Sequence, residues 1–117
     1  MDALWKISER SRFDMKVYLA GKITGDPGYR EKFSTAKSAL EQTGHIVLSP
    51  AELPEGMKPE DYMRICFSMI DSADVVVFLP DWFRSRGASL EYEYCAYIGK
   101  QTEFVECDAE KIYESLS

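Results

Sequence analysis

The feature that most constrains the fold is a nearly continuous apolar run at residues 73–79. Only Asp74 interrupts this run, which otherwise contains three consecutive valines, a phenylalanine and a leucine. A strand without polar alternation is covered on both of its faces, and that is typical of parallel sheets flanked by helices. The run therefore predicts an α/β fold.

Strand and helix patterns alternate along the rest of the chain. Further strands are expected at residues 17–20 and 45–49, and a short, alternating edge strand is expected at residues 102–106. Helices are expected from Pro27 to Gly44 with Asp26 as the cap, and then from Pro59, from Gly87 and after Asp108. This alternation predicts parallel pairing with right-handed crossovers. The simplest arrangement is a flavodoxin-like or Rossmann-like doubly wound open parallel sheet of four or five strands, in the order 2-1-3-4 or with one more edge strand, and with helices on both faces.

The length of 117 residues predicts one domain. Residues 1–14 are expected to be an N-terminal extension, because many such domains begin with a methionine followed at once by a strand, as at Met15. The extension is interpreted as an upstream start, a fusion remnant or a short helix that packs on a neighbour. The single domain is then expected to span residues 15–117.

Composition argues against several classes of function. The formal net charge of -6 is unlike that of a surface that coats a nucleic-acid polymer. No apolar run approaches the roughly 20 residues of a membrane span, and the first residues lack the apolar segment of a signal peptide, so a cytoplasmic protein is expected. Three cysteines without a CxxC spacing and a single histidine, His45, indicate neither a disulfide framework nor a metal site, and no cofactor is expected.

Two loops are expected to flank a ligand crevice. The first loop, residues 21–28, follows the opening strand, and the second, residues 80–86, follows the buried run. These two strands are neighbours in the order 2-1-3-4, and open α/β sheets bind ligands at the carboxyl ends of such strands.

The helix after the second loop carries two glutamates that helical spacing separates. Glu91 shares a mostly apolar row with Gly87, Cys95 and Ile98, whereas Glu93 lies on a polar row and is expected to be solvated. A carboxylate on a buried face costs free energy unless something uses it. Glu91 is therefore either a functional group or an acidic residue favoured near a helix N-terminus by the helix dipole.

Three segments in order resemble the nucleoside 2-deoxyribosyltransferase superfamily. They are an opening strand at residues 17–23 (VYLAGKI), a strand start at residues 72–77 (SADVVV) and a helix start at residues 87–91 (GASLE). Segments at 62–65, 79–82 and 85–88 are closest to those of small, uncharacterised bacterial and phage members. The resemblance covers residues 16 to about 105.

This resemblance implies cleavage of an N-glycosidic bond in a nucleoside or a nucleoside 5′-monophosphate. Glu91 matches the glutamate that attacks the sugar C1′ and forms a covalent glycosyl-enzyme intermediate, which a second base or water resolves. Tyr18 matches a tyrosine near that carboxylate, although as a strand residue it equally fits a place in the core. The resemblance also implies a homo-oligomer, and Trp82 and Phe83 offer apolar surface for it.

One departure from the family pattern concerns the acid that protonates the leaving base. Many active relatives carry an aspartate eight positions before the aspartate of the ADVVV strand, and this chain has Cys66 there. A thiol is a poor general acid, so Asp81 is the preferred substitute, ahead of Glu60 and Asp61. Otherwise the enzyme is slow, or the chain is a binding module that senses or sequesters a nucleotide-derived ligand without cleaving it.

Substrate contacts are expected from both loops. Glycines around Lys22 let the backbone approach a ligand closely. Arginines, hydroxyls and a glycine at a helix N-terminus form an anion site that suits a 5′-phosphate, although the arginines are equally interpreted as solvated surface residues. An aromatic residue in the second loop suits stacking on a base or an oligomer contact. The predicted substrate-binding residues are Gly21, Lys22, Ile23, Trp82, Arg84, Ser85, Arg86, Gly87 and Ser89.

Overall fold

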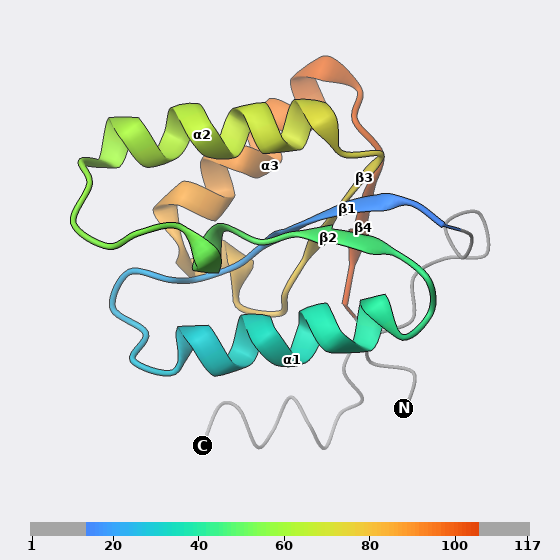
Figure 1. The fold of residues 1–117 in the computed structure, drawn as a ribbon. Helices are drawn as coiled ribbons and strands as arrows, with labels where there is room; N and C mark the ends of the chain where they lie inside the picture. The colour runs from blue at the N-terminus through green and yellow to red at the C-terminus, as the bar shows by residue number, and fades with distance from the viewer. Residues whose placement is uncertain (1–13, 106–117) are drawn as a thin grey trace.

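The computed structural model describes residues 14–105, in which strands and helices alternate along the chain (Figure 1). The order is β1 (Lys16–Ala20), α1 (Tyr29–Glu41), β2 (Ile46–Leu48), the 3-10 helix η3 (Pro50–Glu52), α2 (Pro59–Ser72), β3 (Val75–Phe78), the 3-10 helix η4 (Trp82–Arg84), α3 (Arg86–Ile98) and β4 (Thr102–Phe104). The helix predicted after Asp108 lies outside the described residues, as does most of the predicted extension.

The strands form one parallel sheet in the order β2-β1-β3-β4, which confirms the predicted order 2-1-3-4. Val17 of β1 pairs with Val47 on one side and with Val75 on the other. The described sheet has four strands, with β2 and β4 at its edges. The loops that follow β1 and β3 therefore lie next to each other at one end of the sheet.

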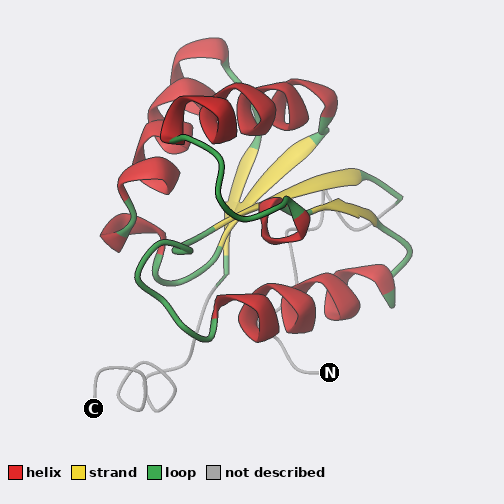
Figure 2. Ribbon diagram, turned by 60° about the vertical axis from the view of Figure 1, so that its left-hand side comes forward, coloured by secondary structure: helices red, strands yellow, loops and turns green. Residues whose placement is uncertain are grey.

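Helices cover both faces of this sheet, with α1 on one face and α2 and α3 on the other (Figure 2). Successive side chains of a strand point to opposite faces, so β1 contributes side chains to two separate hydrophobic cores. Val17 and Leu19 pack with Phe33 and Leu40 of α1 in the first core. Tyr18 and Ala20 pack with residues of α2 and α3 in the second, and all four β1 side chains are fully buried.

The start of α1 differs from the prediction. The helix begins at Tyr29 and not at Pro27, and the side chain of Asp26 caps no helical N–H. Instead, Asp26 Oδ1 accepts the N–H of Gly28 at 2.9 Å, so the aspartate closes a turn before the helix. The helix also ends earlier than predicted, at Glu41, because a turn follows that places Gly44 at φ 96°.

The other helix starts are close to those predicted. Pro59 is the first residue of α2, where its missing N–H costs no hydrogen bond. The helix α3 begins one residue before Gly87, and Ser85 is its N-cap because the Ser85 hydroxyl accepts the N–H of Ala88 at 3.1 Å. No helix among residues 14–105 has the length and apolarity that a membrane crossing requires.

Candidate active site

Glu91 of α3 points into the second core. Its residue is only 6% exposed, whereas Glu93 on the other side of the helix is exposed. The prediction from helical spacing is therefore confirmed for both glutamates. Within the described residues, no lysine or arginine forms an ion pair with Glu91. A buried carboxylate without a cation is uncommon in a protein core, which makes its surroundings informative.

The tyrosine hydroxyl of β1 is the direct partner of this carboxylate. Tyr18 Oη donates a hydrogen bond to Glu91 Oε2 at 2.9 Å, and both groups are buried. The structure thus brings together two residues that lie on the central strand and on a helix that packs over it. Tyr18 occupies the core, as one interpretation of the sequence predicted, and it also contacts the candidate catalytic residue, as the other predicted.

Cys66 of α2 is the third polar member of this cluster. It is 5% exposed, and its thiol interacts with both the Tyr18 hydroxyl and the Glu91 carboxylate. Three elements, β1, α2 and α3, therefore each contribute one group to the Tyr18–Glu91–Cys66 cluster. The sequence identified Cys66 only as a departure from a pattern, and its contact with Glu91 follows from the packing of α2 against α3.

Burial controls the protonation of the cluster. Desolvation raises the pKa of Glu91 from 4.5 to about 7, although the hydrogen bonds from Tyr18 and Cys66 act in the opposite direction. Burial also raises the pKa of Cys66 to about 12 and that of Tyr18 well above its ordinary value, with a further contribution from the nearby carboxylate. Near neutral pH, Tyr18 and Cys66 therefore keep their protons, while Glu91 is only partly ionised.

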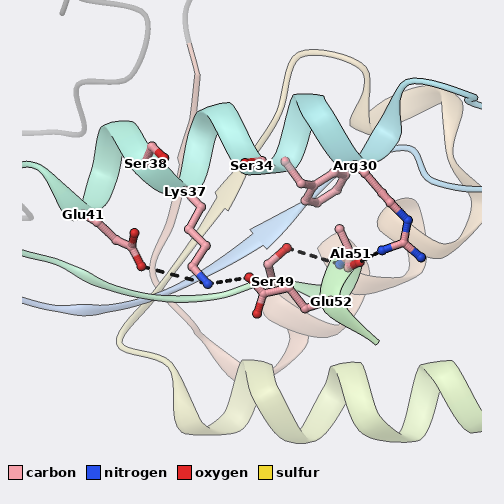
Figure 3. A pocket seen from close by; sticks show the side chains of 9 residues that line it. Arg30, Ser34, Lys37, Ser38, Glu41, Ser49, Ala51 and Glu52 are labelled. Carbon is pink, nitrogen blue, oxygen red and sulfur yellow. Dashed lines mark hydrogen bonds and ion pairs between the residues drawn. The ribbon is translucent and has the colours of Figure 1, made fainter. Parts of the chain in front are cut away.

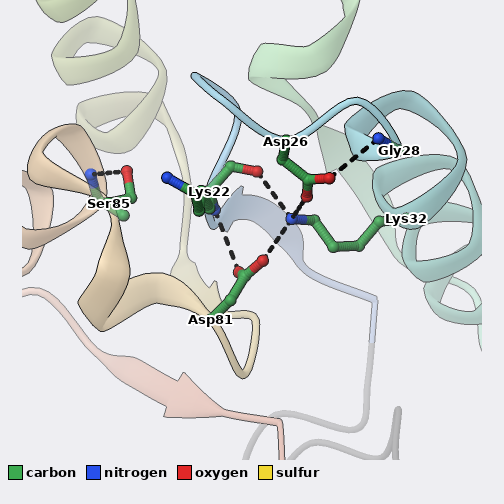
Figure 4. Close-up of polar contacts among 7 residues, drawn as sticks. Lys22, Asp26, Gly28, Lys32, Asp81 and Ser85 are labelled. Carbon is green, nitrogen blue, oxygen red and sulfur yellow. Dashed lines mark hydrogen bonds and ion pairs between the residues drawn. The ribbon is translucent and has the colours of Figure 1, made fainter. Parts of the chain in front are cut away.

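A second polar network joins the two loops at the carboxyl ends of β1 and β3 (Figure 4). Lys32 of α1 donates to Asp26 Oδ2 and to Asp81 Oδ2, both at 2.5 Å, and to the backbone carbonyl of Lys22 at 2.7 Å. Asp81 Oδ1 accepts the N–H of Lys22 at 3.1 Å. The sequence predicted roles for Lys22 and Asp81 but missed Lys32, because nothing in the helical pattern of α1 indicates that its ammonium reaches a loop after β3.

The remaining predicted binding residues have different surroundings. Ile23 packs against the core on the α1 side, and Gly87 lies near Met63 of α2. Arg84 and Arg86 are exposed, and the Arg84 guanidinium lies 5.5 Å from the centre of the Phe83 ring. Ser89 is half-buried in the first turn of α3.

Trp82 packs within an aromatic cluster. Its ring lies 5.3 Å from Phe78, 5.0 Å from Tyr92 and 5.7 Å from Phe104, measured between ring centres. Phe83 extends this cluster outward and is 62% exposed. Part of the Trp82 indole is therefore covered by aromatic residues of β3, α3 and β4.

A hollow of about 390 Å³ lies elsewhere, between α1 and the segment from Ser49 to Glu52 (Figure 3). Its two cations already have partners: Arg30 binds the Ala51 carbonyl and Glu55, and Lys37 pairs with Glu41 and Glu52. It lies on the α1 side of the sheet, whereas the Tyr18–Glu91–Cys66 cluster lies on the other side.

Known proteins share the fold of this chain. The fold is similar to that of a 2-desoxiribosyltransferase from Leishmania mexicana, with a TM-score of 0.62 and 19% identity over 76% of this chain and 62% of that one. This likeness shows the class of fold, an α/β architecture like that of the 2-desoxiribosyltransferase. More narrowly, residues 15–104 match the family described as "Domain of unknown function (DUF4406)", and the chain belongs to this family.

A curated relative comes from Thermofilum pendens (strain DSM 2475 / Hrk 5). It is named "Putative 2'-deoxynucleoside 5'-phosphate N-hydrolase 1" and is 29% identical over 92 residues, which are 74% of this chain and 64% of the relative. The chain thus spans less than two thirds of the length of either relative.

Proposed function

We propose that this protein cleaves the N-glycosidic bond of a nucleoside or nucleoside 5′-monophosphate, with Glu91 as the nucleophile. The observation that carries the proposal is the buried Glu91 carboxylate, which has a tyrosine hydroxyl at 2.9 Å and no cation paired with it in residues 14–105. A carboxylate with only a structural role would gain from a cationic partner. The names of the two relatives support the same class of reaction.

The chemistry suits a single carboxylate. Cleavage of a glycosidic bond passes through an oxocarbenium-like transition state, which a nearby anion stabilises and then captures at C1′. Water or a second base would attack the resulting glycosyl-enzyme, giving hydrolysis or transfer. In this scheme, Tyr18 holds the carboxylate in one orientation through its hydrogen bond to Oε2.

Within this proposal, a 5′-phosphate binds at the start of α3. Arg84 and Arg86 flank the helix N-terminus, where the helix dipole and free backbone N–H groups favour anions. Ser85 contributes less than the sequence suggests, because its hydroxyl already accepts the N–H of Ala88. The phosphate is therefore assigned to Arg84, Arg86 and Ser89 within this proposal.

The test is incubation with a panel of nucleosides and nucleoside monophosphates, followed by chromatography of the free bases. We expect the parent protein to release base and Glu91→Gln to be slower by about 10³-fold or more, because the amide cannot act as the nucleophile. Glu93→Gln, on the exposed face of the same helix, is the matched control and should keep full activity. Equal activity of Glu91→Gln and the parent would reject the proposal.

A second candidate is a non-catalytic nucleotide-binding module. The observation that favours it is Cys66, which contacts Glu91 where the family pattern has a carboxylic acid. A protonated thiol with a pKa of about 12 is a weak proton donor to a leaving base. Tight binding of a nucleotide without any release of base over a long incubation would support this candidate.

The aromatic cluster around Trp82 supports a homo-oligomer. Phe83, Tyr92 and Phe104 leave 62%, 37% and 43% of their surface exposed around it. Such a patch at the β4 edge of the sheet suits contact with a second copy. Light scattering at micromolar concentration should give at least the mass of a dimer, and a monomeric mass would reject this assembly.

A further inference from the structure

The peptide of Lys22 is held from both sides by side chains of other elements (Figure 4). Its N–H donates to Asp81 Oδ1 at 3.1 Å, and its carbonyl accepts from Lys32 Nζ at 2.7 Å. Lys32 and Asp81 also bind each other at 2.5 Å, which closes a ring of three contacts around this single loop residue. The loop after β1 is thereby attached to the loop after β3 and to α1.

All of the hydrogen-bonding capacity of the ammonium is used in this ring. A lysine offers three N–H donors, and Lys32 directs them to the Lys22 carbonyl, Asp26 and Asp81. The side chains of Lys32, Asp26 and Asp81 are 23%, 25% and 27% exposed, so solvent screens this network less than a surface ion pair. The arrangement is specific because one cation of α1 binds both the loop after β1, through Lys22 and Asp26, and the loop after β3, through Asp81.

Gly21 lets the two loops approach each other closely. A β-carbon at this position would lie 3.0 Å from the Leu79 side chain and 3.3 Å from Asp81 Oδ1. A larger residue would crowd the Leu79 side chain first and would also press against the Asp81 carboxylate that accepts the Lys22 N–H. The tight packing at Gly21 and the ring around Lys22 are therefore parts of one arrangement.

We propose that Lys32 and Asp81 are positioning residues that lock the Lys22 peptide, and that the two loops held in this way form a wall of the substrate crevice expected at the carboxyl ends of β1 and β3. This inference rests on the proposed function for its kinetic consequence. It gives Asp81 a role other than proton donation, because both of its oxygens already accept hydrogen bonds from Lys22 and Lys32. Substrate binding then depends on Lys32, although Lys32 belongs to a helix on the other face of the sheet from Glu91.

The kinetic test compares Lys32→Met and Asp81→Ala with the parent protein. We expect KM to rise about tenfold or more while kcat stays within about threefold, because the crevice loosens but Glu91 and Tyr18 are untouched. Lys32→Arg keeps the charge and should recover part of the lost KM. Lys37→Met is the matched control from the same helix, since Lys37 pairs only outside the crevice with Glu41 and Glu52, and its KM should not change.

Hydrogen exchange tests the lock without any turnover. The amide of Lys22 should exchange at least about tenfold faster in Lys32→Met and in Asp81→Ala than in the parent protein. The amide of Leu79, which donates to Ala20 at 2.8 Å in the neighbouring ladder, should be unchanged and excludes general destabilisation as the cause. An equal acceleration at both amides, or none at Lys22, would overturn the inference.

The two proposals fail in different ways. If the parent protein releases no base from any substrate, the proposed function fails, and exchange at Lys22 alone decides the positioning role. If Asp81→Ala lowers kcat by more than about a hundredfold at unchanged KM, Asp81 acts in the chemical step and the positioning role is overturned while cleavage stands.

Discussion

Glu91 and Asp81 are two acidic residues that the structure treats in opposite ways. Asp81 lies in a loop, is partly exposed and is neutralised by Lys32 at 2.5 Å. Glu91 lies in a helix, is buried, and shares its surroundings with a hydroxyl and a thiol but with no lysine or arginine paired to it in the described chain. The difference teaches that the Asp81 carboxylate helps to hold two loops together, whereas the buried Glu91 carboxylate has no cationic partner in the described chain and therefore costs stability when it is ionised.

The pH dependence of turnover should show the largest contrast between the two carboxylates. Glu91 must be ionised to act as a nucleophile, and its pKa is about 7. We expect kcat to approach a tenfold fall for each pH unit below that value, and so to fall about fiftyfold between pH 7 and pH 5. An acid limb near pH 4 would mean that Glu91 ionises like an ordinary surface carboxylate. The contrast between a desolvated Glu91 and a partly exposed Asp81 would then be wrong.

Removing the tyrosine hydroxyl should have the next largest effect. Tyr18→Phe deletes the hydrogen bond to Glu91 Oε2, and bonds of this charged kind are worth about 1.5–3 kcal/mol, so kcat should fall about tenfold to a hundredfold. The same bond lowers the pKa of Glu91, so the acid limb should also move to higher pH. A fall in kcat with no movement of the limb would contradict the assignment. Tyr94→Phe, whose hydroxyl binds exposed Asp71, is the control.

Stability should respond in opposite directions at the two residues. The pKa of Glu91 in the folded protein, about 7, lies above its ordinary value of 4.5. Between these values the folded state holds a proton that the unfolded state has released, so folding is weakened as pH rises through this window. Glu91→Gln should therefore raise the free energy of unfolding by at most about 3 kcal/mol at pH 8, and the gain should vanish below pH 5.

The matched variant for this measurement is Asp81→Asn. It removes the ion pair with Lys32 and should lower the free energy of unfolding by about 1 kcal/mol at pH 8. Urea unfolding at pH 8 and pH 5 measures both effects. Destabilisation of both variants at pH 8 would show that Glu91 contributes to the fold in the same way as Asp81.

The smallest effect is expected at Cys66. Serine keeps a proton donor beside Glu91, so Cys66→Ser should leave kcat within about threefold and cost about 1 kcal/mol of stability through burial of a hydroxyl. Activity and urea unfolding measure the two quantities. A loss of activity beyond tenfold would assign Cys66 a direct part in the reaction and would bring a second group of the cluster into the chemistry.

Much of the fold could be predicted from local patterns. The apolar run at β3 predicted a strand covered on both faces, and its alternation with helices predicted the parallel order that is observed. The predicted start of α1 at Pro27 was wrong because both oxygens of the Asp26 carboxylate accept hydrogen bonds from other groups. One oxygen closes a turn on Gly28 and the other binds Lys32, and neither contact is visible in the sequence next to the helix.

For the candidate site too, the sequence identified single residues, whereas the contacts between them became visible only in the structure. Helical spacing alone placed Glu91 on the buried face of α3, because a period of 3.6 residues depends only on order along the chain. Tyr18 was identified only through the resemblance of the opening strand to a known superfamily. The contact between these two residues, the approach of Cys66 to both, and the reach of Lys32 to Asp81 join segments from different elements.

The sequence by itself determined which elements form, in which order they pair, and which face of each is buried, since these follow from periodicity and chain connectivity. Only the tertiary structure decided which carboxylate is paired and which is not. Partner choice depends on distances of a few ångströms between elements that are far apart in the chain, and on the loss of water around Glu91 that packing against β1 and α2 produces.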